Sequence, residues 1–464
     1  MLDSVLLWID KNRRAWLDDL KQWLSIPSVS AISSHDKDTL SAADWAMFYL
    51  RGAGMEARLI PTARHPCVLA TTPTGLYPPD APHVLFYGHY DVQPAEPLDK
   101  WISPPFSPTL RDGKLFARGA SDDKGQVFCH LAALVAWKQI AAELPVQITV
   151  LLEGEEETGS ANLRQVIESQ KDLLKTASTV IISDSSQFAH GIPAITTGLR
   201  GLVYYQIILT GANQDLHSGV YGGSVANPAN VLARMLGKLH DDNGRITIPH
   251  FYDDVKLPEE ALRTQWASLP FSDQALAASL GVEALTGEVG FSTLERRWSR
   301  PTLDINGLTS GYQGSGAKTV LPGVASAKVS MRLVPQQNPQ TIAAAFEAFM
   351  HSITPPGVKL VMESLSSSPA AVTPIDSPAV RAASAALEIG FGKPPVFVRE
   401  GGSIPVVNWF KELLGIDSVL VGFGLPDDNL HAPNEKFDLD CFYGGIRTAA
   451  ALYDKLLCVT KVGR

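Results

Sequence analysis

Cysteine is scarce in this sequence, which has only four cysteines among its 464 residues. Cys67, Cys129, Cys441 and Cys458 are scattered along the chain, and no two of them form a CxxC pair. The spacing therefore indicates neither a disulfide framework nor a zinc site made of thiolates. We interpret the four side chains as reduced thiols and expect the protein to be cytoplasmic.

Runs of basic residues and long apolar segments are also missing. The 39 basic and 48 acidic residues give a formal net charge of −9, which argues against nucleic acid and against an anionic membrane surface as partners. No stretch is long and apolar enough to span a bilayer. Residues 1–30 mix charged and apolar residues at helical spacing, unlike the core of a signal peptide. We therefore expect a small molecule as the partner.

The composition that remains is ordinary for a globular protein, with 45% hydrophobic and 19% charged residues. A prior of roughly one domain per 100–200 residues predicts two or three domains. Helix-forming and β-forming residues are mixed along the whole chain, which indicates an α/β or α+β class.

Four apolar, β-forming runs are each followed by histidine or carboxylate residues. The runs and the residues after them are VLFYG with His89 and Asp91, VQITVLLEG with Glu156 and Glu157, TVIIS with Asp184, and SVLVGFG with His431. In open α/β sheets, ligands bind at the carboxyl ends of the strands. Imidazole and carboxylate groups gathered there are typical ligands of divalent metals such as zinc and manganese.

A further carboxylate comes from the segment ARGASDDKG, which leads from a short β run into a helix expected over residues 126–143. A single aspartate ahead of a helix is usually only an N-cap. Here there are two, Asp122 and Asp123, in a chain that already offers His89 and Asp91, and this favours a metal ligand. The ligands together exceed what one four-coordinate zinc can use, which suggests two metals.

The chain changes character near residue 200, where strand and helix patterns alternate up to about residue 365. This order, with a further strand expected near residues 318–321, resembles a split βαβ sandwich. Residues 242–312 show weak periodicity and receive no assignment. We therefore predict a catalytic domain made of residues 1–198 and 371–464, interrupted by an inserted domain over residues 199–370. At the N-terminus, residues 2–24 are expected to form one amphipathic helix.

The chain resembles the superfamily of di-zinc dipeptidases, carboxypeptidase G and aminoacylases, and most closely its cytosolic nonspecific dipeptidase and carnosinase branch. The resemblance runs in order along nearly the whole chain. It rests on His431 and on the motifs GHYDVQP, ARGASDDKG, EGEEETGS, ISD, DLHSGVYGG, GSGAKTVLP, MRLVP and REGGSIPV.

The resemblance implies a role for each matching residue. Asp122 would bridge two divalent metals, with zinc favoured and manganese as the alternative. His89 and Asp184 would complete one metal site, and Glu157 and His431 the other. The remaining implied roles are Glu156 as general base, Asp91 as the residue that orients His89, and His217, Thr319, Arg332 and Ser403 as substrate contacts.

The resemblance also implies the fold and the assembly. We expect an α/β zinc-peptidase-like mixed sheet flanked by helices, with an α+β ferredoxin-like insert that serves as lid and dimerisation domain. In the expected homodimer, His217 would reach the active site of the other subunit. The peptide bond between Asp122 and Asp123 is expected to be cis.

Three functions are compatible with these residues. The first is metal-dependent hydrolysis of dipeptides, and the second is hydrolysis of N-acyl amino acids by the same metals and base. The third is a catalytically inactive binding protein on the same fold, which the presence of Glu156 beside every ligand disfavours. Asp184 in place of a glutamate favours a peptidase over the carboxypeptidase G type.

Overall fold

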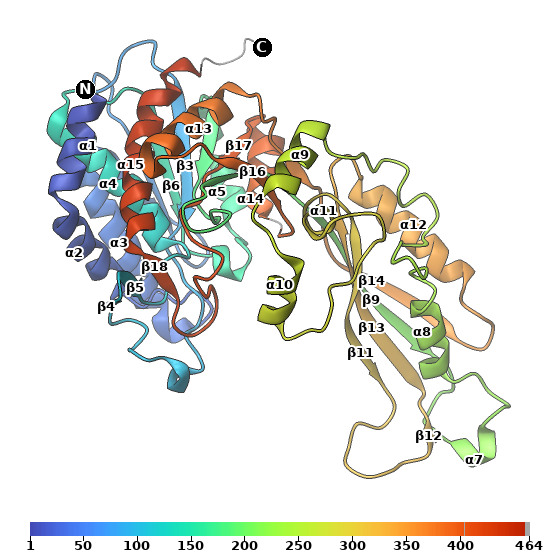
Figure 1. Ribbon diagram of the computed structural model, residues 1–464. Helices are drawn as coiled ribbons and strands as arrows, with labels where there is room; N and C mark the ends of the chain where they lie inside the picture. The colour runs from blue at the N-terminus through green and yellow to red at the C-terminus, as the bar shows by residue number, and fades with distance from the viewer. Residues whose placement is uncertain (403, 460–464) are drawn as a thin grey trace. The chain divides into compact units, whose positions relative to one another are not determined.

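The structure, a computed structural model, describes residues 1–402 and 404–459. The chain forms two compact units (Figure 1). Unit 1 comprises residues 1–197, residues 373–398 and the segment that starts at Trp409, whereas unit 2 comprises residues 198–372 and 399–408. Unit 1 is therefore discontinuous in sequence.

Unit 1 contains a mixed sheet with the strand order β1-β2-β6-β3-β7-β17-β8, and β15 and β16 both pair with β8. Its four central strands, β6, β3, β7 and β17, run parallel to one another. The strands of this sheet are β1 Glu56–Ile60, β2 Cys67–Thr71, β3 His83–His89, β6 Gln147–Glu153, β7 Thr179–Ile182, β8 Ala194–Leu199, β15 Ala371–Val372, β16 Val396–Glu400 and β17 Ser418–Leu420. A small sheet of β4 Thr109–Arg111, β5 Lys114–Phe116 and β18 Lys436–Asp438 has the order β18-β5-β4.

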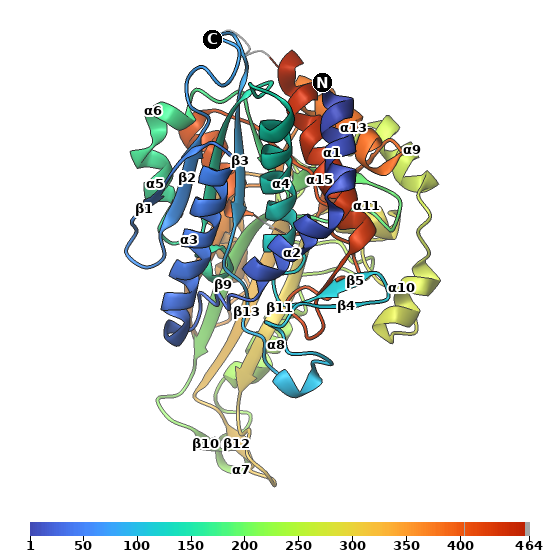
Figure 2. The same cartoon turned by 90° about the vertical axis from the view of Figure 1, so that its left-hand side faces the viewer.

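Helices cover both faces of the large sheet because its central strands are apolar on both sides, and every residue of β3 is buried. On one face α3 packs against β1 and β2, α4 against β3, and α13 against β17, as Figure 2 shows for α3 and α4. On the other, the Tyr87 ring meets Phe410, whose helical turn contacts α5 and α6. The helices of unit 1 are α1 Leu2–Lys11, α2 Arg13–Leu24, α3 Asp36–Gly52, α4 Lys124–Ile140, α5 Leu163–Ser169, α6 Lys171–Leu174, α13 Pro378–Phe391 and α15 Leu439–Lys455. The short helix α14 Pro405–Trp409 belongs to unit 2 except for its last residue.

The single helix expected over residues 2–24 is wrong, because the chain forms two helices with a break at Asn12. The Asn12 side chain donates a hydrogen bond of 2.7 Å to the carbonyl oxygen of Trp8. Short polar side chains that bond to nearby backbone compete with helix formation in this way.

Unit 2 is built on a four-stranded antiparallel sheet with the order β11-β13-β9-β14 (Figure 1). One face of this sheet packs with α8 and α12 in a core of its own, which includes Ile207, Val231 and Phe346. The elements are β9 Gly201–Thr210, β10 Leu216–His217, α7 Ser218–Tyr221, α8 Pro228–Leu236, α9 Glu260–Ser268, α10 Asp273–Leu280, α11 Thr293–Trp298, β11 Thr302–Ser310, β12 Val320–Leu321, β13 Val324–Leu333, α12 Pro339–Ser352 and β14 Lys359–Ser368.

The fourth strand of this sheet is not the one expected from the sequence. Residues 320–321 do form a strand, β12, but it pairs with β10. The place in the sheet belongs to β11, which lies in the segment that received no assignment. That segment, residues 242–312, is held by a buried ion pair in which Arg300 Nε and Nη2 each lie 2.7 Å from an oxygen of Glu288.

Among the residues that the structure describes, no helix has both the length and the apolar character needed to cross a bilayer.

Candidate metal centre

The carboxyl ends of the four central strands of unit 1 meet at one edge of the sheet, as expected for parallel neighbours. His89 is the last residue of β3, and Asp184 follows β7. The Glu156–Thr158 turn follows β6, and the loop after β17 carries His431. The edge therefore collects side chains from distant parts of the sequence.

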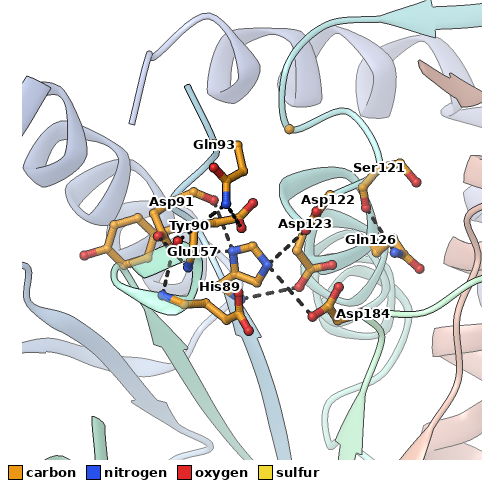
Figure 3. A network of polar contacts seen from close by, with 12 residues as sticks. His89, Tyr90, Asp91, Gln93, Ser121, Asp122, Asp123, Gln126, Glu157 and Asp184 are labelled. Atoms are coloured by element: carbon orange, nitrogen blue, oxygen red, sulfur yellow. Dashed lines mark hydrogen bonds and ion pairs between the residues drawn. The ribbon is translucent and has the colours of Figure 1, made fainter. Parts of the chain in front are cut away.

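Two groups of potential ligands lie at this edge, and Asp122 belongs to both. In the first group, His89 Nε2 lies 3.2 Å from Asp122 Oδ1 and 4.0 Å from Asp184 Oδ2. In the second, His431 Nε2 lies 2.9 Å from Asp122 Oδ2 and 3.4 Å from Glu157 Oε2. The two oxygens of one carboxylate thus face two different imidazoles. Figure 3 shows the His89 ring between Asp91 and the carboxylates of Asp122 and Asp184.

These residues fit divalent cations chemically. The His89 side chain is fully buried, and its Nε2 atom makes no hydrogen bond to any residue that the structure describes. A buried imidazole nitrogen that faces carboxylate oxygens without a hydrogen bond is typical of a metal ligand. The donors are two imidazoles and three carboxylates, a set that suits zinc and manganese.

The pKa shifts in the two ligand groups also favour a bound cation. Although burial opposes it, the neighbouring imidazoles of His431 and His89 hold the pKa of Asp122 below its usual value. Hydrogen bonds to Asp122 and Glu157 raise the pKa of His431 to about 10. The carboxylates thus favour positive charge at this position, which a divalent cation would also supply.

Asp91 lies beneath the site and is completely buried. Its backbone oxygen lies 3.1 Å from His89 Nδ1, and its Oδ1 atom lies 3.4 Å from the same nitrogen. Its carboxylate also accepts hydrogen bonds from the backbone N–H groups of Glu156 and Glu157, at 3.2 and 3.1 Å, and from Ser30 Oγ at 2.6 Å. Asp91 therefore fixes the position of the His89 ring and also that of the turn with both glutamates, and its contact with the turn could not be predicted from the sequence.

Glu156 lies half-buried beside the ligands. Burial raises the pKa of its carboxyl group to about 8, helped by Asp184 and Glu157 and opposed by His89. A carboxylate with a pKa near neutral can both accept and return a proton, which is what a general base needs.

Sequence reasoning missed Gln93, whose Nε2 atom donates a hydrogen bond of 2.7 Å to Glu157 Oε2 (Figure 3). It orients the carboxylate of a potential ligand, through the same oxygen that lies 3.4 Å from His431 Nε2. Only its place in the motif GHYDVQP, four residues after His89, could have indicated a role. The peptide bond between Asp122 and Asp123 is cis, as the resemblance predicts.

The substrate contacts implied by the resemblance lie in unit 2, apart from Ser403, which is outside the described residues. His217 and Thr319 are neighbours, because His217 pairs with Val320 and the next backbone N–H donates to the Thr319 oxygen. Arg332 lies near the opposite end of β13. Figure 2 shows β10 and β12 beyond one end of the β13 sheet, and Figure 1 shows β12 there.

The region of His217 lies far from Arg332 within unit 2. Val324 and Arg332 are eight positions apart on β13, which corresponds to about 26 Å at the usual strand rise. The structure therefore does not bring His217 and Arg332 together within one chain. The imidazole of His217 is exposed, and its Nδ1 atom accepts a hydrogen bond of 3.0 Å from the Gly219 backbone.

Comparison with known proteins gives consistent matches. Residues 85–455 match the family described as Peptidase family M20/M25/M40. The Cys-Gly metallodipeptidase dug1 of Schizosaccharomyces pombe is 34% identical, and the match covers 99% of each chain. The crystal structure of human carnosine dipeptidase 1 has a TM-score of 0.81 and 30% identity, covering 98% of each chain. The metallo-carboxypeptidase Sso-CP2 from Sulfolobus solfataricus has a TM-score of 0.80 and 31% identity, covering 95% of this chain and 99% of the other.

Proposed function

Because the chain belongs to the peptidase family M20/M25/M40 and is therefore a metallopeptidase, we propose that it is a dipeptidase that works with two divalent metals. The observation that carries this proposal is the Asp122 carboxylate, which is shared by two groups of potential ligands beside Glu156. His89 and Asp184 would hold one metal with Asp122, and Glu157 and His431 the other. Zinc is the proposed metal, with manganese as the alternative.

When bound, the two cations would polarise the scissile carbonyl and lower the pKa of a nearby water molecule. Glu156 accepts a proton from the attacking water on its carboxylate and then passes that proton to the leaving amine. The Asp91 contact to Nδ1 fixes the orientation of the His89 ring and leaves Nε2 free to act as ligand.

We propose that Arg332 binds the free carboxylate of the substrate, since a guanidinium matches a carboxylate with two parallel hydrogen bonds. His217 would donate a hydrogen bond to the oxyanion that forms during attack. The contact between the Gly219 N–H and His217 Nδ1 supports this role, because it leaves the proton of a neutral imidazole on Nε2.

We further propose that the enzyme is a homodimer formed through unit 2, which would serve as the lid and dimerisation domain. An extended dipeptide spans about 7 Å, far less than the roughly 26 Å along β13 between the region of His217 and Arg332. One dipeptide can contact both side chains only if they come from different subunits. Thr319 would accompany His217, and Ser403 would act with Arg332.

The proposal includes a cytoplasmic location. The buried, free thiols of Cys67, Cys129 and Cys441 support it, because cytoplasmic proteins keep their cysteines reduced.

Removal of the metals with a chelator should abolish activity, and zinc or manganese should restore it. The far-ultraviolet circular dichroism should change little, since the protein's own contacts hold the ligand loops, among them the hydrogen bonds to Asp91. Activity that survives in metal-stripped protein, checked by elemental analysis, would refute the two-metal mechanism.

The substrate class is tested by a panel of free dipeptides, tripeptides, and N-acetyl amino acids with matching C-terminal residues. We expect the highest kcat/KM on dipeptides. N-acetyl amino acids as the best substrates would instead identify an amidohydrolase, because the same ligands and base serve both reactions. Preference for longer peptides would point to a carboxypeptidase, as the likeness to Sso-CP2 allows.

A further inference from the structure

The carboxylate of Glu435 is completely buried and accepts four hydrogen bonds in unit 1. One oxygen accepts from Arg118 Nη1 at 2.8 Å and from the Gly119 N–H at 2.9 Å. The other accepts from the backbone N–H groups of Ser121 and Asp122, at 2.9 and 3.0 Å. One side chain thus holds nearly the whole loop that presents Asp122.

Glu435 also belongs to the loop of a second potential ligand, because it lies four positions after His431. It joins two segments about 313 residues apart in the sequence. Asp122 and His431 are also the two residues whose side chains lie 2.9 Å apart in the second ligand group. The single carboxylate of Glu435 therefore connects the two loops that carry these potential ligands.

A second contact between the same loops strengthens this connection. Asp428 Oδ2 accepts a hydrogen bond of 2.8 Å from Ser121 Oγ, and Asp428 Oδ1 lies 2.6 Å from Lys436 Nζ. Pairing of β18 with β5 continues the contact away from the site. The loop that presents Asp122 is therefore connected to the segment around His431 by three sets of contacts. These are the hydrogen bonds to Glu435, the hydrogen bond to Asp428 and the pairing of β18 with β5.

Stability alone does not account for a buried charge here. Arg118 and Glu435 are almost fully inaccessible to solvent, at 1% and 0% exposure. Buried ion pairs often contribute no more to stability than apolar side chains of the same volume, because both charges lose their hydration. A carboxylate that accepts hydrogen bonds from four residues of one loop does, however, define their positions, which apolar contacts would not do.

We propose that Glu435 is a positioning residue that sets the spacing of Asp122 and His431 and thereby the affinity of the Asp122–Glu157–His431 group for a divalent cation. This inference rests on the proposed two-metal function. Glu435 touches neither substrate nor metal in this assignment. It acts through the Asp122 backbone and through its own loop.

The test replaces Glu435 by glutamine in the full-length protein. The amide nitrogen cannot accept hydrogen bonds, so either the Arg118 pair of donors or the Ser121 pair loses its acceptor. Zinc dissociation constants are measured by competition with a chelator of known affinity, and zinc content by elemental analysis. We expect one of two zinc ions to bind about 10–100-fold more weakly, the usual effect of losing a residue that supports a ligand.

Glu288→Gln provides the matched control. Glu288 is also a buried glutamate bonded to an arginine, Arg300, but it lies in unit 2. The Glu288→Gln substitution should lower the melting temperature about as much as Glu435→Gln does, but it should leave both zinc affinities unchanged. Equal zinc weakening in the two variants would overturn the inference, because it would then reflect lost stability alone.

Glu435→Asp keeps the charge that Arg118 requires but is one methylene shorter, so it serves if the glutamine variant does not fold. A folded Glu435 variant that binds both zinc ions with wild-type affinity would also overturn the inference. Wild-type protein that binds no zinc or manganese would instead refute the proposed function. The two failures are therefore distinguishable.

Discussion

Exchange of Glu156 for glutamine should lower kcat by about 10²–10⁴-fold, the usual contribution of a general base. Glutamine has nearly the same shape but cannot accept the proton of the attacking water. Both metals should remain bound, since Glu156 belongs to neither ligand group. Steady-state kinetics and elemental analysis on the same preparation check both parts.

The two neighbouring glutamates provide the controls. Glu157→Gln should lose metal, because Glu157 Oε2 lies 3.4 Å from His431 Nε2 in the second ligand group. Glu155→Gln should retain kcat and metal, since Glu155 belongs to neither ligand group and its Oε2 atom accepts a hydrogen bond of 2.7 Å from Asn162. Metal loss in the Glu156 variant with metal retained in the Glu157 variant would reverse the assignment.

His217→Ala should lower kcat by about 10²–10³-fold, as expected for loss of an oxyanion donor. If His217 serves the other subunit, mixing this variant with Glu156→Gln restores activity. Each heterodimer then has one intact site, formed by the metal centre of one chain and the His217 of the other. Random mixing of the two inactive proteins should recover at most about a quarter of wild-type activity.

The control mixes Glu156→Gln with Glu157→Gln. Both changes lie in unit 1, so no pairing of subunits contains an intact site. The expected result is no recovery, whichever subunit His217 serves. A His217 mixture that also stays inactive, or a monomer by light scattering at the assay concentration, would refute the shared site.

The fold could be predicted from the sequence where burial leaves a strong pattern. The apolar run before Gly88 predicts β3, because a strand buried on both faces needs apolar residues at every position. The structure shows why the run ends in glycine. A Cβ atom at Gly88 would lie 2.5 Å from Val127 Cγ2 and 2.9 Å from Asp123 Oδ2.

The pattern fails for β11, because most of its side chains are exposed or half-exposed and only Leu303 is buried. Its place in the sheet depends on backbone pairing with β13, which no periodicity of apolar residues records. The short apolar run of β12 resembles a strand more closely in sequence than β11 does, although β12 pairs with β10 and not with the four-stranded sheet.

The residues of the site were likewise only partly predictable from the sequence. Potential ligands could be found because each follows an apolar run or stands in a recognisable motif. Gln93 and Glu435 could not, because their roles depend on contacts with residues about 64 and 313 positions away. A single polar residue carries no periodic signal, so only the folded chain reveals its partner.

His431 leaves the ribosome long after the other ligands. Asp184 and His431 are 247 residues apart, and at roughly 5–20 residues per second their synthesis is separated by about 12–50 s. Through most of this interval β17 is absent, so β7 lacks its parallel neighbour. A nascent chain can therefore present only the His89–Asp122–Asp184 group to a cation, and it does so before Glu435 exists to hold the Asp122 loop. If the protein binds two metals as proposed, the second would be loaded late in biosynthesis.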